Sequence, residues 1–258
     1  MNGGHMVNAV RVGVEWINIY PQNDAECPAV PNLRFAGDCA EGFLLAMRSC
    51  GHDDIFDWGN DNAWSADFDH PDFGGDSLRW SDNVHFCYVA GHGGSTYTSD
   101  PFAAFNIGFS SRHVDPGFLK CRSISSRWRL GSNRLKWFAI DSCDIVSDTV
   151  AEHIVKMWGG PMQGAHLLLG FIGLGRIWPT TQSRRISFAL DICGGIPIAN
   201  AWLDTGYSLE SPDQPVRPIA IAAGFTRDEA LARRDSETLD WLWFDVHATN
   251  WLAWKWRG

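Results

Sequence analysis

Two stretches decide the expected fold of this chain: HFCYVAGHGG at residues 85–94 and LKWFAIDSCD at residues 135–144. Each is a short apolar run that stops abruptly at a reactive side chain. Such runs, bounded by glycine or polar residues, are typical of buried strands in a parallel sheet. Because functional groups gather at the carboxyl ends of these strands, we expect His92 and Cys143 to meet at one edge of the sheet.

A histidine and a cysteine at one sheet edge are the parts of a thiol nucleophile and its base. Cysteine reacts as the thiolate, and a neighbouring imidazole helps the thiol to ionise and then protonates a departing amine. The backbone N–H groups of Gly93 and Cys143 are placed to face a developing oxyanion. A helix predicted at 148–158 would also favour the thiolate if it started near Cys143. The pattern predicts acyl transfer through a thioester.

The rest of the chain predicts an α/β domain with a mainly parallel sheet. The expected strands span 7–18, 164–171 and 218–224, and the expected helices span 32–50, 148–158, 183–192 and 197–203. In the helix at 148–158, Val150, Ile154, Val155 and Met157 are expected to face the core. The polar, basic segment up to residue 128 predicts a helix or loop over the sheet edge. The tail at 240–256 predicts either a closing strand or a binding surface.

Residues 7–258 are expected to form a single domain, because no linker or internal repeat divides them. Residues 1–6 resemble the remnant of a cloning tag and are left out of the fold argument. The formal net charge of −9 argues against a nucleic-acid partner. No apolar run approaches the length of a membrane span, and no signal peptide opens the chain. We expect a cytoplasmic protein with no membrane partner.

Seven cysteines are scattered at irregular positions. The odd count and the lack of any C-x-x-C pair argue against a disulfide framework and against zinc, so free thiols are expected. Four of them stand in apolar contexts that predict structural roles: Cys39, Cys50, Cys87 and Cys193. His166, on an apolar run, is expected to be a hydrogen-bonded core residue.

The segment 53–80 is dense in aspartate, glycine and aromatic residues and predicts a long irregular loop. Alternating carboxylates on a glycine-containing loop suit a calcium ion. The candidate ligands are Asp67, Asp69, Asp72 and Asp76. Because the EF-hand pattern with its terminal glutamate is absent, we favour a solvated acidic loop capped by aromatic side chains. No cofactor is expected.

The two motifs resemble those of caspase-like cysteine peptidases of clan CD, over roughly residues 84–146. The run from Tyr88 to Gly93 is similar to their hydrophobic block ending in His-Gly, and the run from Trp137 to Cys143 is similar to the block ending in the nucleophile. Metacaspases show a similar Gly-His-Gly and Asp-Ser-Cys. The flanking sequence is more like an uncharacterised bacterial branch of caspase-like proteins.

The resemblance implies a caspase-hemoglobinase-like three-layer sandwich, with His92 and Cys143 as the dyad and Gly93 in the oxyanion hole. Asp141 occupies the place of a metacaspase aspartate that helps to bind a basic substrate side chain, so a preference for Arg or Lys is expected. Asp144 departs from the histidine usual there; it would raise the pKa of the thiol if close, or form a second acidic wall. Gly94 and Ser95 complete the expected substrate-binding set.

Three functions remain open from the sequence. The first is a cysteine-dependent peptide hydrolase, ligase or cyclase acting on a peptide or peptide-like substrate. The second is a non-proteolytic enzyme that modifies a small molecule, which a deep closed cavity at the strand ends would favour. The third is a catalytically inactive binding module on the same fold, which the departure at Asp144 motivates. The oligomeric state is left open.

Overall fold

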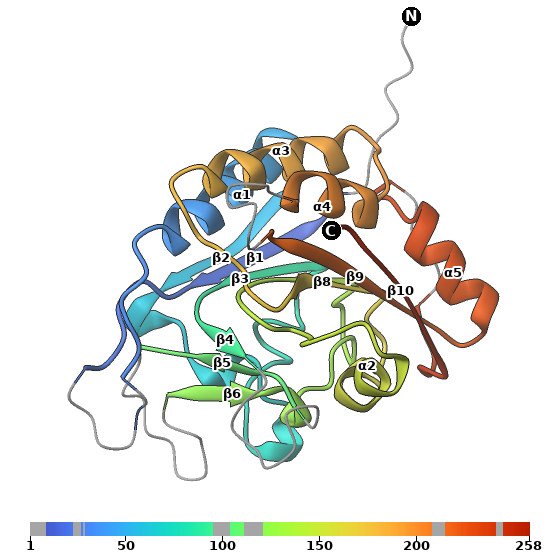
Figure 1. Ribbon diagram of the computed structural model, residues 1–258, viewed down its shortest axis with the longest axis horizontal. Coiled ribbons are helices and arrows are strands. Elements are labelled where there is room, and N and C mark those ends of the chain that lie inside the picture. Colours follow the sequence, from blue (N-terminus) through green and yellow to red (C-terminus); the bar gives the residue numbers. More distant parts are fainter. Residues whose placement is uncertain are drawn as a thin grey trace, which may run out of the picture.

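The computed structural model describes residues 9–22, 27, 29–94, 104–110, 121–207, 215–240 and 245–258. Within these residues the main sheet has seven strands in the order β10-β9-β8-β7-β3-β1-β2 (Figure 1). The five strands from β2 to β8 are parallel, and β9 and β10 close the sheet antiparallel. Their bounds are β1 Arg11–Trp16, β2 Asp53–Gly59, β3 Phe86–Ala90, β7 Trp137–Asp141, β8 Leu167–Ile172, β9 Arg217–Gly224 and β10 Trp251–Trp256.

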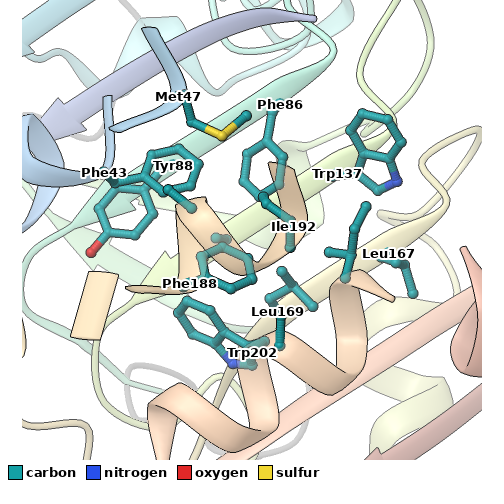
Figure 2. Packing of buried hydrophobic residues seen from close by; sticks show 14 of the residues in the cluster. Phe43, Met47, Phe86, Tyr88, Trp137, Leu167, Leu169, Phe188, Ile192 and Trp202 are labelled. Carbon is teal, nitrogen blue, oxygen red and sulfur yellow. The ribbon is translucent and has the colours of Figure 1, made fainter. Parts of the chain in front are cut away.

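One face of this sheet is covered by helices (Figure 1). They are α1 Ala36–Ser49, α3 Thr181–Cys193 and α4 Ile198–Gly206. Between them and the sheet lies a core of buried apolar side chains (Figure 2). Phe43 of α1 stacks between Tyr88 and Phe188, with ring centroids 5.0 and 5.8 Å away. Burying aromatic rings of this size provides much of the driving force for packing helices on the sheet.

The opposite face carries a smaller antiparallel sheet, several short 3₁₀ turns and one helix (Figure 1). The elements are β4 Gly93–Gly94, β5 Asn106–Gly108, β6 Arg122–Ile124 and α2 Ala151–Trp158, with η1 Asn60–Asn62, η2 Ser65–Asp67, η3 Pro71–Phe73 and η4 Ser125–Arg127. A second core, which includes Phe68, Trp128 and Phe138, fills the space beneath them. Strand β4 starts directly after His92, so this small sheet fixes the chain as it leaves β3.

The observed α/β architecture agrees with the predicted one. The predicted strands and helices around β1, β3, β7, β8, β9, α1, α3 and α4 are confirmed within a few residues. The tail forms β10, which pairs antiparallel with β9 and is therefore a closing strand. An unpredicted helix, α5 at Arg227–Ser236, begins with a capping box between Thr226 and Glu229.

The irregular loop predicted at 53–80 is wrong at its start, where β2 pairs with β1 as an edge strand. The helix predicted at 148–158 begins only at Ala151, and Val150 and Val155 are exposed, whereas Ile154 and Met157 face the core. Because α2 starts well beyond Cys143, the condition for its dipole to favour the thiolate is not met. The basic segment before residue 128 forms β6 and η4 over the part that is described.

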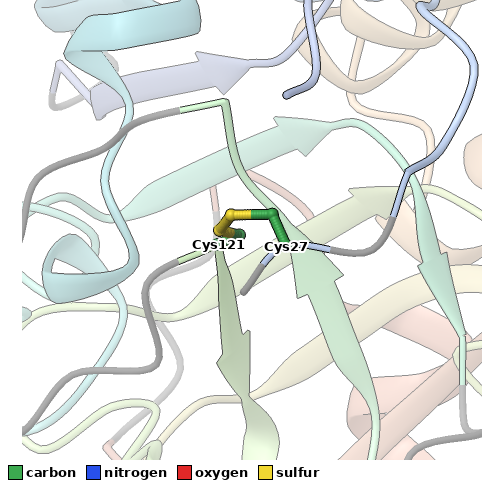
Figure 3. The surroundings of a disulfide bond; sticks show 2 residues. All are labelled: Cys27 and Cys121. Carbon is green, nitrogen blue, oxygen red and sulfur yellow. A yellow bond between two sulfur atoms is a disulfide. The ribbon is translucent and has the colours of Figure 1, made fainter. Parts of the chain in front are cut away.

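The prediction of free thiols throughout is wrong, because Cys27 and Cys121 form a disulfide (Figure 3). It joins the loop after β1 to the start of β6. Cys39 and Cys87 are buried as expected, whereas Cys50 is exposed. His166 is confirmed as a core residue: it is fully buried, and its Nδ1 lies 2.6 Å from Oε1 of Glu237.

Over the part of the chain that the structure describes, none of the helices combines the length and the apolar character needed to cross a membrane.

Candidate functional site

The site is organised by the pairing of β3 with β7. These parallel neighbours run in register, with Ala90 opposite Asp141, and the N–H of Gly91 donates to the carbonyl of Asp141 at 3.2 Å. His92 and Cys143 each follow that pair by two residues. The two residues therefore lie at the carboxyl ends of adjacent strands, on the same edge of the sheet, because parallel strands end on the same side.

The imidazole of His92 is oriented by a backbone carbonyl. Its Nε2 lies 2.8 Å from the carbonyl oxygen of Pro31. A carbonyl oxygen only accepts hydrogen bonds, so Nε2 carries the proton and Nδ1 keeps its lone pair. The ring also packs against Tyr20, with centroids 4.9 Å apart. In the neutral ring, the carbonyl of Pro31 thus fixes the tautomer in which Nδ1 is the nitrogen without a proton.

Tyr20 also holds the backbone of His92, because the N–H of His92 donates to the Tyr20 hydroxyl at 2.7 Å. Tyr20→Phe is expected to leave this N–H without its partner and to lower the free energy of unfolding by about 1–3 kcal/mol. Urea denaturation measures the loss. Tyr207→Phe, on the opposite helical face, is the matched control and should stay within about 0.5 kcal/mol of wild type. Equal losses in both variants would contradict the assigned bond.

Cys143 is partly exposed, and its thiol donates to the carbonyl of Gly175 at 3.2 Å. Burial raises the pKa of this thiol, and the nearby carboxylates of Asp144 and Asp141 raise it further. Within the described chain, no hydrogen bond joins Cys143 to His92. The resting thiol is therefore protonated and turned toward the carbonyl of Gly175.

Glycines let the segments at this edge approach closely. A Cβ on Gly93 would lie 2.4 Å from Oγ of Ser142 and 2.6 Å from the Phe105 ring. A Cβ on Gly175 would lie 2.4 Å from the carbonyl oxygen of Ser142. These distances are shorter than any real carbon contact, so only glycine permits the observed packing. The chain after β3 and the loop after β8 both press against residues 142–143.

Asp141 is fully buried beneath the site and is already paired. Its carboxylate accepts from Nε and Nη2 of Arg185 at 2.6 and 3.0 Å and from the Tyr88 hydroxyl at 2.7 Å. Since Arg185 neutralises it and no surface of Asp141 is exposed, Asp141 does not offer a free anion to a basic substrate side chain. No pattern in the sequence indicates that Arg185 pairs with Asp141, because Arg185 stands in a helix where charged residues usually face solvent.

Asp144 is half-buried and adopts a left-handed backbone with φ of 59°. Its N–H donates to the carbonyl of Gly173 at 2.6 Å. Burial raises the pKa of its carboxyl, against opposing effects from Gly173 and from the positive charge of Arg217. A left-handed aspartate is uncommon. It turns the chain sharply after Cys143, and Asp144 interacts with Arg217 and Ser147.

A cavity of about 140 Å³ lies beside His92. Tyr20, Val30, Ile107 and Phe109 give it apolar walls, and Gly93, Gly94, Asn106 and Arg122 also line it. Asn106 is buried, and its side-chain oxygen has no hydrogen-bond partner among the described residues. Gly94 therefore lines the cavity beside His92, whereas Ser95 lies outside the described residues. Cys143 is not part of this lining.

The four aspartates proposed as calcium ligands do not converge. Asp67 and Asp69 are buried, whereas Asp72 and Asp76 are exposed. Asp69 contacts Nε of Arg127 at 2.9 Å and accepts from Ser123. No group of three or more ligands suited to a metal is present among the described residues. The favoured prediction of a solvated acidic loop is wrong for Asp67 and Asp69, which are built into the second core.

Burial raises the pKa of Asp67 to about 7, and the neighbouring Asp76 adds to the effect. The ordinary value is about 3.9, so between about pH 4 and pH 7 the folded chain holds a proton that the unfolded chain releases. The bound proton on Asp67 therefore adds to the free energy of unfolding. This contribution is complete below about pH 4 and is lost as the pH rises through about 7. Asp67→Asn should therefore lose less stability than wild type between about pH 5 and pH 8, as measured by urea denaturation. The exposed Asp72→Asn is the control, and identical pH slopes in all three proteins would contradict this prediction.

Sequence reasoning missed three residues that shape the site: Tyr20, Pro31 and Gly175. Tyr20 and Pro31 stand in a proline-rich loop that follows β1, and Gly175 stands in the loop that follows β8. The one signal in the sequence is their position after the carboxyl ends of predicted strands, where loops carry functional groups.

A family model described as a domain of unknown function, DUF6345, matches residues 14–243. This range includes β3, β7 and both strand ends. No curated protein matches the chain.

Proposed function

The chain belongs to the DUF6345 family, and we propose that it is a cysteine-dependent acyl-transfer enzyme, a peptide hydrolase or ligase on a caspase-like sandwich. His92 is its base and Cys143 its nucleophile. The observation that carries the proposal is the register of β3 and β7, which sets both residues two positions beyond the Ala90–Asp141 pair. A peptide or peptide-like amide is the proposed substrate, and no cofactor takes part.

The reaction begins when the Cys143 side chain rotates away from the Gly175 carbonyl. Nδ1 of His92 takes the thiol proton while the proton on Nε2 stays there and keeps its hydrogen bond to the carbonyl of Pro31. The sulfur attacks the substrate carbonyl, and the negative charge on its oxygen faces the N–H groups of Gly93 and Cys143. The imidazolium returns the proton to the departing amine and leaves a thioester. Water or a second amine then releases the acyl group.

The cavity beside His92 indicates which substrate side chain fits. The described residues that line it include no carboxylate, so none of them would pair with the charge of a lysine or arginine side chain. The buried side-chain oxygen of Asn106 is an acceptor that lacks a donor. The cavity therefore favours an uncharged side chain that donates a hydrogen bond, in place of the Arg or Lys preference expected from Asp141.

An inactive binding module is the second candidate. Three observations speak for it: the raised pKa of Cys143, its bond to Gly175, and the lack, among the described residues, of a hydrogen bond to His92. A thiol that never becomes a nucleophile would have these properties. The two candidates differ in one measurable property, which is the reactivity of the thiol.

Thiol reactivity tests the proposal directly. Intact chain is treated with iodoacetamide, digested and mapped, and the labelling rate of Cys143 is compared with that of the exposed Cys50 in the same molecule. We expect His92→Ala to lower the Cys143 rate by at least about tenfold, since the imidazole activates the thiol, and to leave the Cys50 rate unchanged. Cys143→Ala should abolish turnover of a library of amide substrates. An unchanged Cys143 rate in His92→Ala would reject the dyad.

The location of the protein stays a prediction. The cytoplasmic location predicted from the sequence rests on the lack of a signal peptide and of a membrane-length apolar run and on free thiols, but the Cys27–Cys121 disulfide is more typical of an oxidising compartment. We therefore propose that the chain works where disulfides persist.

A further inference from the structure

Strand β10 forms one outer edge of the main sheet (Figure 1). Its direction of hydrogen bonding follows from a bond at its end, where the N–H of Arg257 donates to the carbonyl of Pro218 in β9 at 3.1 Å. In an antiparallel pair, successive residues direct their N–H and C=O groups to opposite sides of the strand. The residues of β10 that direct these groups away from β9 are therefore Leu252, Trp254 and Trp256.

Two further bonds agree with this direction. The N–H of Ala223 in β9 donates to the carbonyl of His166 on the far side at 2.9 Å, which leaves its even-numbered neighbours facing β10. On the outer side, Nη1 of Arg234 in α5 donates to the carbonyl of Trp254 at 3.4 Å. The outward N–H and C=O of Leu252 have no partner among the described residues. Strand β10 thus presents an edge to which another strand can pair.

This edge lacks the usual protection against pairing. Edge strands of soluble proteins commonly carry a proline or an outward charge, whereas β10 reads WLAWKW. Its one charged side chain, Lys255, bonds to Asn200 of α4 on the helical face. Trp251 and Trp256 are 50% and 45% exposed. An open apolar edge of this kind is typical of a strand that pairs with another chain.

A groove of about 240 Å³ runs along the edge, between β10 and α5. Residues 251–254 form its strand side. Its helix side has a spacing of three and four residues, which places the side chains on one face of α5; they are Arg227, Ala230, Leu231 and Arg234. In a groove between an edge strand and a helix, an extended peptide adds as a further strand and directs alternate side chains into the groove.

The charges of the groove indicate which peptide fits. The described residues that line it include two arginines and no carboxylate. Arg234 is paired with Asp235, at 2.6 Å between Nη2 and Oδ2. Arg227 is exposed and has no partner among the described residues. An acidic side chain would complement it.

The spacing within the groove adds a second requirement. Arg227 and Leu231 stand four residues apart on α5, which is about 6 Å along the helix. Two residues of a strand cover about 6.6 Å. A peptide with its acidic side chain opposite Arg227 therefore places the side chain two positions away opposite Leu231.

We propose that this groove is a docking site for an extended segment of a partner protein. The segment adds to β10 as an eighth strand, with an acidic side chain on Arg227 and an apolar side chain two positions away, between Leu231 and Trp251. A second copy of the chain fits less well. Antiparallel pairing of two β10 strands keeps both α5 helices on one face of the joined sheet, so it would bring a second pair of arginines beside the first.

The proposed docking site does not depend on the proposed acyl transfer. Strands β9, β8 and β7 separate β10 from β3, the strand that leads to His92.

The test uses the full chain and a fluorescein-labelled peptide, TETLTET. It carries a glutamate two positions to each side of its leucine and therefore meets the requirement in either strand direction. We expect saturable binding by fluorescence anisotropy. The peptide TKTLTKT, with lysine in place of glutamate, should bind at least about tenfold more weakly. Equal binding of the two peptides, or no binding of TETLTET up to its solubility limit, would overturn the proposal.

N-methylated peptides test whether a strand is added. One derivative of TETLTET is N-methylated on its threonines and the other on its glutamates and leucine, because alternate residues of an added strand direct their N–H groups toward β10. We expect one derivative to lose binding by at least about tenfold and the other to keep it. Unchanged binding of both derivatives would show that no strand is added.

Two charge variants locate the acidic contact. Arg227→Glu should weaken the binding of TETLTET by at least about tenfold and strengthen that of TKTLTKT, since it reverses the charge of the groove. Arg48→Glu makes the same change of charge on α1, where Arg48 forms an exposed pair with Asp54. It should leave the binding of both peptides unchanged. Equal effects of the two variants would contradict the contact with Arg227.

Leu252→Pro tests the edge itself, because it removes an outward N–H and leaves the bonds to β9 in place. We expect weaker binding of TETLTET and an unchanged sedimentation velocity of the chain. If the chain instead sediments as a dimer that Leu252→Pro dissociates and TETLTET does not, the occupant is a second copy and the proposal is overturned. Circular dichroism checks the fold, and if Leu252→Pro fails to fold, the N-methylated peptides decide.

Discussion

Arg185→Met is expected to lower the free energy of unfolding by about 3–5 kcal/mol, because it leaves the buried carboxylate of Asp141 without its cation. Arg185 is 2% exposed and Asp141 is 0% exposed, so water cannot replace the lost charge. The guanidinium also lies over the rings of Trp202 and Phe171, with its central carbon 4.5 and 5.3 Å from the ring centroids. Urea denaturation followed by tryptophan fluorescence measures the loss.

Two control variants show whether the loss of stability comes from the unpaired buried charge of Asp141 or merely from breaking an ion pair. Arg48→Met breaks an exposed pair with Asp54 and should cost less than about 1 kcal/mol. The double variant Asp141→Asn/Arg185→Met removes both charges, and the Tyr88 hydroxyl can still donate to the new amide oxygen. It should therefore recover much of the loss. If the double variant is no more stable than Arg185→Met, the uncompensated charge is not the cause.

The central part of the fold could be predicted because its signal is local. The runs at 86–90 and 137–141 are apolar throughout, and every residue in both strands is buried. Continuous apolar runs of this length favour inner strands of a parallel sheet, and inner strands place their ends side by side. The position of His92 and Cys143 on one sheet edge followed from these two runs alone.

The parts that were missed lack such a signal. Strand β2 reads DDIFDWG, and only Phe56 within it is buried, because an edge strand exposes most of its side chains. Strands β4, β5 and β6 have two or three residues each, too few to show a period. They form because the larger sheet provides an apolar surface beneath them, and this surface exists only after the chain has folded.

The partners of the site residues could not be predicted because they lie far apart in sequence. Asp141 and Arg185 are 44 residues apart, and His92 and Pro31 are 61 residues apart. The basic-pocket hypothesis for Asp141 depended on a free carboxylate, and only the fold reveals that α3 already supplies its cation. Cysteine spacing likewise does not reveal which thiols meet.

Replacing both Cys27 and Cys121 by serine is expected to lower the free energy of unfolding by about 2–5 kcal/mol. The disulfide joins residues separated by 94 positions, so its loss frees a long closed loop in the unfolded chain. The effect should reach the site as well, because Cys121 lines the cavity beside His92 and Cys27 lies in the loop that carries Tyr20 and Pro31. We expect the iodoacetamide labelling of Cys143 to become less dependent on His92.

Reduction of the wild-type chain should reproduce the stability loss of this double variant, and the double variant itself should not respond to the reductant. Cys50→Ser/Cys193→Ser, measured without reductant, changes two cysteines that are not linked in the structure. Its stability should stay close to that of the unreduced wild type, because the Cys27–Cys121 disulfide is intact and no loop is released. Two results together would contradict this prediction: a free energy of unfolding unchanged by reduction, and labelling of Cys143 that still depends fully on His92. The disulfide would then neither stabilise the fold nor hold the Pro31 carbonyl against the imidazole. The orientation of His92 would then come from Tyr20 and the small sheet alone.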